Sequence, residues 1–468
     1  MAVEWSTSPP ELLLGLDRTA PAPLRDQLEG ALRAGIREGR LRPGERLPSS
    51  RALAAQLGVA RGVVTECFAQ LQAEGYLRSR HGSATWVAEG QVPDDAARRA
   101  HRPALPVVWP VDLRPGVPDL DSFPREQWGR SSRAALRDAP NALLGYTDGA
   151  GVVELRDVLA SYLSRVRNAR ARADDVVVTA GFAQGLQLVL AALVDRGLTT
   201  LAVEDPGDRD SHALAASLGL EVVPVRVDDE GIDVDALAAT GAGAVLVTPA
   251  HQSPTGVLLG AARRRQLVRW ARERGATILE DDYDAEFRYD DEPVGALQGL
   301  APDDVVLLGS VSKSLAPAVR LGWAVCPPHL ADDVAARRDR ADRGSPVLDQ
   351  LALAHLMSGG HYDRHLRRMR TRYARRRAVL VGALLDQVPG VSVTGMAAGF
   401  HLVATTRLPA DREDSVVATA AARGVGLHAL GRYRASPVDG QAAFVLGFGN
   451  LRSSSVRDGV ARIADLLA

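Results

Sequence analysis

From about residue 112 onward, short apolar runs alternate with segments of helical periodicity, and this alternation restricts the fold more than any other feature. Continuous apolar strands separated by helices predict an α/β domain whose mostly parallel sheet is covered on both faces. Such sheets bind ligands at the carboxyl ends of their strands. Helical patterns such as Gln184–Asp195 and Arg263–Glu273 lie between some of the runs. The strand-like runs are Val176–Thr179, Thr200–Val203, Ala244–Thr248, Thr277–Leu279, Val305–Leu308 and Trp323–Cys326.

Residues 11–88 follow a different pattern, with apolar residues four positions apart and turn residues between short helical segments. A first helix containing Leu28 and Leu32 ends near Gly39, and a short second helix follows the hydroxyl residues at 49 and 50. A third helix begins near Arg61, and two short strands at 76–78 and 84–87 follow it. This order predicts a winged helix-turn-helix domain.

The two patterned regions are separated by residues 89–111, which contain four prolines and no periodicity. This composition predicts a linker between a domain at 11–88 and a larger domain at 112–468. A chain of 468 residues also exceeds the size at which one core keeps growing. The net charge of −1 gives the whole molecule no preference for polyanions, so any affinity for DNA must be local.

Cysteine usage and the N-terminal residues indicate a cytoplasmic protein. The two cysteines, Cys67 and Cys326, lie far apart in sequence, which predicts neither a disulfide framework nor a metal site. The first residues lack the basic start and apolar core of a secretory signal. No apolar run approaches the ~20 residues that a membrane span requires, so we expect no membrane partner.

Lys313 is the only lysine among 56 basic residues. Since arginine serves wherever charge alone is needed, this position is expected to use lysine chemistry, namely an amine that forms a Schiff base. Ser310, Ser312 and Arg320 lie close in sequence and suit a phosphate. The set predicts pyridoxal 5'-phosphate as the cofactor. A leftover surface lysine in an arginine-rich chain is the alternative.

Two further segments support a pyridoxal phosphate site. Asp281 and Tyr283 follow a predicted strand, where a carboxylate could keep the pyridine nitrogen protonated and a phenol could approach the ring oxygen. Gly181, Phe182 and Ala183 open a predicted helix and would offer backbone N–H groups to a phosphate. Each segment alone has an ordinary structural explanation, but all of them in order around one lysine indicate a binding site.

The first domain resembles the DNA-binding domain of GntR-type bacterial transcription factors. The resemblance rests on the segments Gly44–Ala54, Leu57–Arg61, Gly75–Leu77 and Arg80–Ser83. It implies that double-stranded operator DNA is the partner. The residues implied to face that DNA are Ser50, Arg51, Arg61, His81 and Gly82, together with Thr65, where some relatives have a further arginine.

Residues 112–468 resemble fold-type I pyridoxal-phosphate enzymes of the aspartate aminotransferase group, and both domains together resemble the MocR-type subfamily of GntR regulators. By resemblance, Lys313 carries the Schiff base, Asp281 pairs with the pyridine nitrogen and Tyr283 approaches the ring hydroxyl. Tyr146 matches the tyrosine that reaches the phosphate of the other subunit's cofactor, which implies a homodimer with shared sites.

Three departures weaken the expectation of amino-acid turnover. Ser253 stands where aminotransferases carry asparagine before Pro-Thr-Gly, and Asp208 stands where an aromatic residue stacks on the pyridine. Phe182 is a candidate replacement for that aromatic. The arginine that binds a substrate carboxylate is not evident, with three candidates: Arg432, Arg434 and Arg452.

These observations favour a transcriptional regulator over an enzyme. We expect its aminotransferase-like domain to sense pyridoxal phosphate, a small amino compound, or both. Two alternatives stay open: an aminotransferase with an accessory DNA-binding domain, and a regulator that kept the fold but lost the cofactor.

Overall fold

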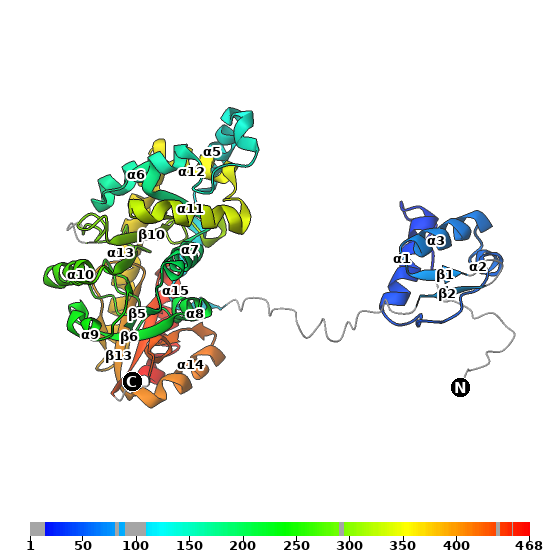
Figure 1. Cartoon of the computed structure of the whole chain (residues 1–468). Helices are drawn as coiled ribbons and strands as arrows, with labels where there is room; N and C mark the ends of the chain where they lie inside the picture. Colours follow the sequence, from blue (N-terminus) through cyan, green and yellow to red (C-terminus); the bar gives the residue numbers. More distant parts are fainter. Residues whose placement is uncertain (1–14, 80–83, 89–108, 290–293, 437–439, 452) are drawn as a thin grey trace. The chain divides into compact units, whose positions relative to one another are not determined.

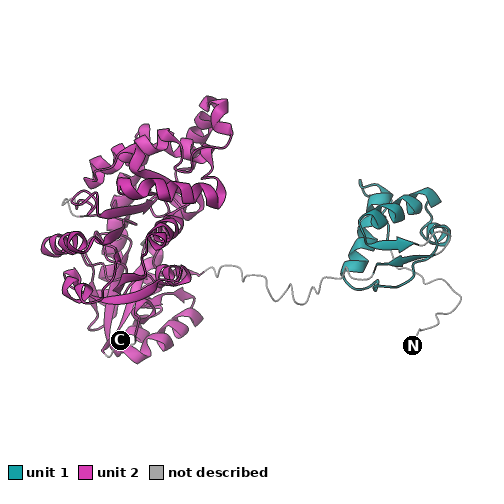
Figure 2. Cartoon of the chain, in the orientation of Figure 1, with its two compact units in different colours: residues 1–107 teal, residues 108–468 magenta. Residues whose placement is uncertain are grey.

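The structure, a computed structural model, describes residues 15–79, 84–88, 109–289, 294–436, 440–451 and 453–468. The chain divides into two compact units, residues 1–107 and 108–468, coloured teal and magenta in Figure 2. Residues 109–111, which we expected in the linker, lie in the larger unit, where Val111 pairs with Val425. Each unit has its own apolar core.

The smaller unit has the predicted order of three helices followed by a hairpin (Figure 1). The Ser49 hydroxyl accepts a hydrogen bond from the backbone of Ala52 and caps the second helix, which Gly58 ends in a left-handed conformation. Leu28, Leu32 and other apolar residues of the first helix are buried. The elements are α1 (Leu24–Arg37), α2 (Ser50–Leu57), α3 (Arg61–Ala73), β1 (Leu77–Ser79) and β2 (Thr85–Val87).

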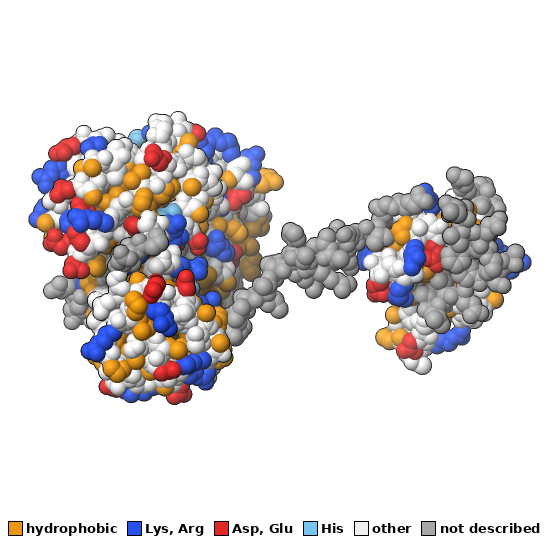
Figure 3. All heavy atoms as spheres, turned by 90° about the horizontal axis from the view of Figure 1, so that it is seen from below, with side chains coloured by type: hydrophobic (Ala, Val, Ile, Leu, Met, Phe, Trp, Pro, Cys, Tyr) orange, Lys and Arg blue, Asp and Glu red, His pale blue; other side chains and the backbone are white. Residues whose placement is uncertain are grey.

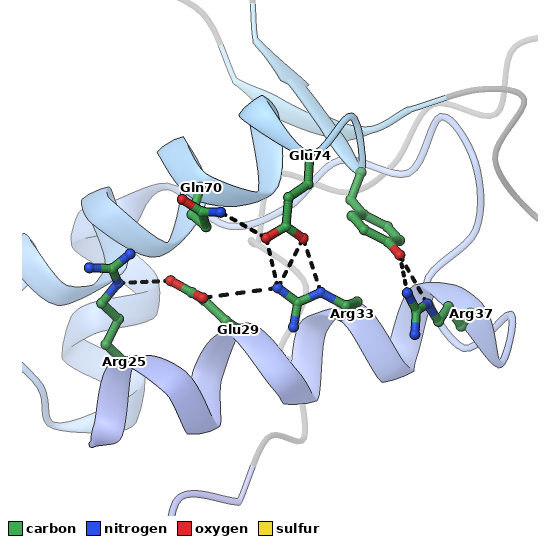
Figure 4. A network of polar contacts seen from close by, with 7 residues as sticks. Arg25, Glu29, Arg33, Arg37, Gln70 and Glu74 are labelled. Atoms are coloured by element: carbon green, nitrogen blue, oxygen red, sulfur yellow. Dashed lines mark hydrogen bonds and ion pairs between the residues drawn. The ribbon is translucent and has the colours of Figure 1, made fainter. Parts of the chain in front are cut away.

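A polar network joins α1 to α3 and to the residue before β1 (Figure 4). Arg33 donates two hydrogen bonds from its Nη2 atom, and one from Nε, to the Glu74 carboxylate at 2.9–3.0 Å. Arg37 donates to the Tyr76 hydroxyl, and Arg25 pairs with Glu29 at 2.8 Å. Exposed pairs of this kind contribute at most about 1 kcal/mol each. The α1 arginines therefore take part in contacts within the unit.

The larger unit is built on an eight-stranded sheet in the order β4-β11-β10-β9-β8-β5-β6-β7. Its central pairs, from β10 through β6, are parallel, whereas β11 and β7 run antiparallel to their neighbours. The prediction of a mostly parallel sheet is confirmed. The strands are β4 (Val176–Thr179), β5 (Thr200–Asp205), β6 (Glu221–Asp228), β7 (Gly231–Ile232), β8 (Ala244–Val247), β9 (Thr277–Asp281), β10 (Val305–Ser310) and β11 (Gly322–Val325).

Helices cover both faces of this sheet, as continuous apolar strands require. Along β10, Val306 and Leu308 pack into the core beneath α7 and α11, while Val305 packs into the core beneath α9 and α10. The helices are α5 (Arg125–Asp138), α6 (Val153–Arg167), α7 (Phe182–Asp195), α8 (Arg209–Ser217), α9 (Val234–Ala238), α10 (Ala261–Arg274), α11 (Pro328–Asp342), α12 (Val347–Ser358) and α13 (His361–Gln387).

A second, four-stranded antiparallel sheet lies in the C-terminal part, in the order β12-β13-β16-β15. A short parallel pair joins β14 to β3 and so returns the chain to the start of the unit. The elements are β3 (Val111–Asp112), β12 (Ser392–Thr394), β13 (His401–Pro409), α14 (Glu413–Ala422), β14 (Val425–Gly426), β15 (His428–Ala429), β16 (Gln441–Gly447), α15 (Ser453–Ala461) and α16 (Ala464–Leu467).

The surface of the larger unit carries charges of both signs. On the face shown in Figure 3, basic and acidic side chains are interspersed among apolar ones. This distribution agrees with the small net charge. Within the part of the chain that the structure describes, no helix combines the length and apolar character of a membrane span.

Candidate functional site

A cavity of about 460 Å³ opens at the edge of the sheet where β5, β9 and β10 end. It contains most of the side chains that the sequence predicts for a cofactor, although they come from segments far apart in the chain. Ser310 ends β10, and Asp281 ends β9. The predicted residues that line the cavity are Phe182, Ala183, Ser253, Asp281, Tyr283, Ser310, Ser312, Lys313 and Arg320.

Lys313 reaches into this cavity on a turn after β10. Its Nζ atom donates a hydrogen bond to the carbonyl oxygen of Gly116 at 2.5 Å. Burial lowers the pKa of Lys313, and the carboxylates of Asp281, Asp284 and Asp208 act in the opposite direction. A lowered pKa increases the fraction of neutral amine, which is the form that attacks an aldehyde.

Asp281 is half-buried as a residue, but its Oδ1 atom is fully buried. Its Oδ1 atom has no hydrogen-bond partner among the described residues. Burial, together with the neighbouring Asp208, Asp282 and Asp284, raises the pKa of Asp281 well above its ordinary value, while Lys313 lowers it. A buried carboxylate in this position favours a ligand that brings an N–H or a positive charge.

The acidic neighbours of Asp281 have structural partners instead. Glu280 accepts hydrogen bonds from the backbone of Leu297 and Gln298 at 2.9 and 3.0 Å. Asp282 forms a two-point ion pair with Arg167, with both distances at 2.8 Å. Successive side chains of a strand point to opposite faces, so only the middle carboxylate of this run reaches the cavity.

The opposite end of the cavity suits an anion. Gly181 precedes α7 with φ +110°. No side chain of a described residue caps that helix, so its first N–H groups are available to a ligand. A Cβ atom at Gly181 would lie 3.6 Å from a guanidinium nitrogen of Arg320, which shows how closely the two approach. Ser310 and Ser312 line the same cavity. Hydroxyl, guanidinium and helix N–H groups together match a phosphate.

Some of the residues at which this chain departs from the aminotransferase pattern line the cavity, and others do not. Asp208 lines the cavity but also caps α8 by accepting from the backbone of Ser211. Phe182, the candidate replacement for the stacking aromatic, lines the cavity. Arg432 and Arg434 are not among its lining residues, and Arg452 lies outside the described residues. Tyr146 is also not among them, and it is 91% exposed.

The cavity also has lining residues to which the sequence assigned no role, among them Gly116, His401 and Tyr433. Gly116 supplies the carbonyl that Lys313 contacts. His401 and Tyr433 come from the second sheet and the turn after β15. No spacing motif marks these two residues, because they reach the cavity only through the packing of the second sheet.

The smaller unit gathers its predicted DNA contacts at the starts of α2 and α3. Arg51, Arg61 and Thr65 are exposed, and the Arg61 Nε atom lies 3.4 Å from the Ser50 hydroxyl. Thr65 donates to the backbone carbonyl of Arg61 at 3.0 Å. Two helix N-termini with exposed arginines form a surface suited to phosphates. The other two candidates, His81 and Gly82, lie outside the described residues.

Two protein families match this chain, one in each of its two compact units. Residues 24–87 match the gntR family of bacterial regulatory proteins, and residues 112–425 match the aminotransferase class I and II family. The chain is 33% identical to the probable rhizopine catabolism regulatory protein MocR of Rhizobium meliloti, over 96% of this chain and 94% of that protein. The chain belongs to the MocR-type subfamily of GntR regulators.

Other relatives agree with this assignment. This MocR-type regulator is 32% identical to the pyridoxine biosynthesis transcriptional regulator PdxR of Corynebacterium glutamicum, over 98% of this chain and 99% of the relative. An archaeal alanine:glyoxylate aminotransferase of known structure has a TM-score of 0.70 at 24% identity, covering 77% of this chain and 91% of that one. The fold-type I aminotransferase prediction for the larger domain is confirmed.

Proposed function

We propose that this regulator binds pyridoxal 5'-phosphate in the cavity around Lys313, and that the bound state changes its affinity for operator DNA. The observation that carries the proposal is the unpartnered, buried Oδ1 atom of Asp281 in a cavity that also contains the only lysine. A pyridine nitrogen would supply the missing partner, and a phosphate would occupy the Arg320 end.

Each of the predicted cofactor residues that line the cavity then has a defined task. Lys313 attaches the aldehyde, Asp281 holds the ring nitrogen in its protonated form, and the Tyr283 hydroxyl contacts the ring oxygen. Ser310, Ser312, Arg320 and the N–H groups of Gly181, Phe182 and Ala183 bind the phosphate, while Ser253 borders the ring. The bound cofactor supplies an electrophilic carbon to which an incoming amine can attach.

The effector is proposed to be a small amino compound, the cofactor itself, or both. An amine that displaces Lys313 would free its Nζ atom and change the charge in the cavity. A ligand shifts a regulator only by its different affinities for two states of the protein. We propose a cytoplasmic homodimer in which Tyr146 of each subunit reaches the other subunit's site, which agrees with its exposure.

On the DNA side, we propose that Ser50, Arg51, Arg61 and Thr65 contact the operator, with His81 and Gly82 completing the contact. The support is the exposure of the two arginines at helix N-termini, together with the gntR-family match. The second helix of such a motif lies in the major groove of DNA.

The test is a mobility-shift titration of the full chain on its own promoter, with and without pyridoxal phosphate. We expect specific binding whose affinity changes with the cofactor, and we expect borohydride reduction to fix the cofactor to Lys313. If no specific DNA is bound in either state, the regulatory function is wrong. If turnover of amino and keto acids far exceeds that of Lys313→Ala, the enzymatic alternative gains support.

A further inference from the structure

A buried polar cluster lies next to Tyr283 and belongs to none of the tasks assigned above. It consists of His251, Asp284 and His401, which are 2%, 1% and 4% exposed. His251 follows β8, Asp284 follows β9, and His401 begins β13. One ring nitrogen of each histidine and one carboxylate oxygen of Asp284 all lie within 4.8 Å of one another. Three chain segments therefore place titratable groups together beside the cavity.

His251 links this cluster to Tyr283. Its Nδ1 atom lies 2.9 Å from Oδ2 of Asp284 and 3.0 Å from the Tyr283 hydroxyl. The rings of His251 and His401 are 4.8 Å apart. The Nε2 atom of His251 has no partner among the described residues. Among the described residues, both hydrogen bonds of the His251 side chain therefore involve one nitrogen, Nδ1.

The carboxylate of Asp284 fixes the proton on that nitrogen. An ionised carboxylate only accepts hydrogen bonds, so it selects the histidine tautomer that carries its hydrogen on Nδ1. The Tyr283 oxygen then accepts from the same N–H. A phenol has one hydrogen to donate. Accepting from His251 leaves that hydrogen free to turn either to the cavity or to the Asp284 carboxylate, whose hydrogen bond helps to raise the pKa of Tyr283.

The backbone encloses this arrangement tightly. A Cβ atom at Gly399, whose φ is +61°, would lie 2.3 Å from Oδ2 of Asp284 and 2.6 Å from Nδ1 of His251. Close packing of this kind limits both side chains to few rotamers. Burial and the carboxylates of Asp284 and Asp281 raise the pKa of Tyr283 well above its ordinary value, so the phenol stays a donor.

We propose that His251 and Asp284 are positioning residues that direct the Tyr283 hydroxyl into the cavity, and thereby set the protonation of the cofactor linkage at Lys313. The inference rests on the proposed function, since only a bound cofactor gives Tyr283 a ring oxygen to contact. His251 and Asp284 do not line the cavity, so they act through Tyr283.

The experiment is a pH titration of the visible absorbance of the full chain loaded with pyridoxal phosphate. We expect Tyr283→Phe to shift the pH midpoint of this titration, and the direction of that shift is the reference for the other variants. We expect His251→Ala and Asp284→Asn to shift it in that same direction, by about one pH unit, since one unit corresponds to a tenfold change in the protonation equilibrium. His251→Asn, whose amide N–H can replace Nδ1–H, should recover most of the wild-type midpoint.

The decisive measurement combines substitutions. In the Tyr283→Phe background, His251→Ala should produce no further shift, whereas a general disturbance of the cavity would add to it. His428→Asn is the matched control, because His428 also contacts a tyrosine hydroxyl of the cavity wall, that of Tyr433 at 2.9 Å. We expect its midpoint to equal that of the wild type.

The outcomes separate the two proposals. If the wild type shows no absorbance that depends on Lys313, the proposed cofactor function fails. If the wild type shows it, but the midpoints of His251→Ala and Asp284→Asn equal the wild-type midpoint, the positioning role is overturned. If His251→Ala does not load with cofactor, Asp284→Asn and His251→Asn decide: a shift in the first and recovery in the second support the role, and equal midpoints reject it.

Discussion

The two units of this regulator build their candidate sites differently: the smaller unit from one short segment of the chain, the larger unit from segments far apart in sequence. In the smaller unit, the described candidates lie within residues 50–65, are largely exposed, and depend on helices whose ends are marked locally by Ser49 and Gly58. In the larger unit, the candidates that line the cavity come from residues 182–320, and the cavity adds residues from 115 to 445. The first site depends on local structure and charge, whereas the second depends on tertiary packing and burial.

The largest expected effect tests whether the larger unit depends on lysine chemistry or on charge. Lys313→Arg keeps a cation but removes the nucleophilic amine. We expect complete loss of covalent cofactor attachment, measured by mass spectrometry after borohydride reduction. DNA binding without cofactor should be unchanged. Attachment that persists at another residue would contradict the assignment of Lys313.

The second prediction tests whether the two units fold separately. Leu32 is fully buried in the core of the smaller unit, so Leu32→Ala should lower its free energy of unfolding by about 2–5 kcal/mol. We expect DNA binding to fall while cofactor absorbance stays intact, as followed by urea titration with both signals. The control Leu385→Ala, at a leucine 59% exposed, should change stability by less than about 0.5 kcal/mol. Parallel loss of both signals would show that the units unfold together.

The third prediction concerns burial in the cavity wall. Burial raises the pKa of Glu204 to about 7, against hydrogen bonds from Thr248 and Gln252 that lower it. The folded state therefore holds a proton that the unfolded chain has lost, and stability falls as pH rises from about 4.5 to 7.

Glu204→Gln removes this dependence. Relative to the wild type, it should gain stability at pH 8, by at most roughly 3 kcal/mol from a difference of 2.5 pKa units, and gain little at pH 4.5. Thermal unfolding at the two pH values measures the difference. A gain of equal size at both would show that the ionisation of Glu204 is not its source.

The smallest effect is expected on the exposed surface of the smaller unit. Arg61→Ala should weaken operator binding about tenfold and reduce the slope of log affinity against log salt by about one. Arg25→Ala is the control, because Arg25 is also partly exposed but pairs with Glu29 on α1. An equal loss in both variants, measured by salt-dependent mobility shift, would mean that general positive charge drives binding.

Local sequence patterns were enough to predict the order of the main elements, the parallel character of the sheet and the cofactor candidates. They were enough because strand and helix periodicity, helix caps and the single lysine are local properties of the chain. Asp281 and Tyr283 line the cavity, because a strand end fixes which edge of the sheet its residues reach.

Only the tertiary structure shows which of several neighbouring carboxylates reaches the cavity around Lys313. Glu280, Asp281 and Asp282 are all acidic, but backbone donors bind Glu280 and Arg167 binds Asp282. Of the three, Asp281 lines the cavity, and its Oδ1 atom has no partner among the described residues. His401 reaches the cavity only through the packing of the second sheet, and His251 meets Asp284 across 33 residues. Such neighbours follow from packing between distant segments, which no local pattern encodes.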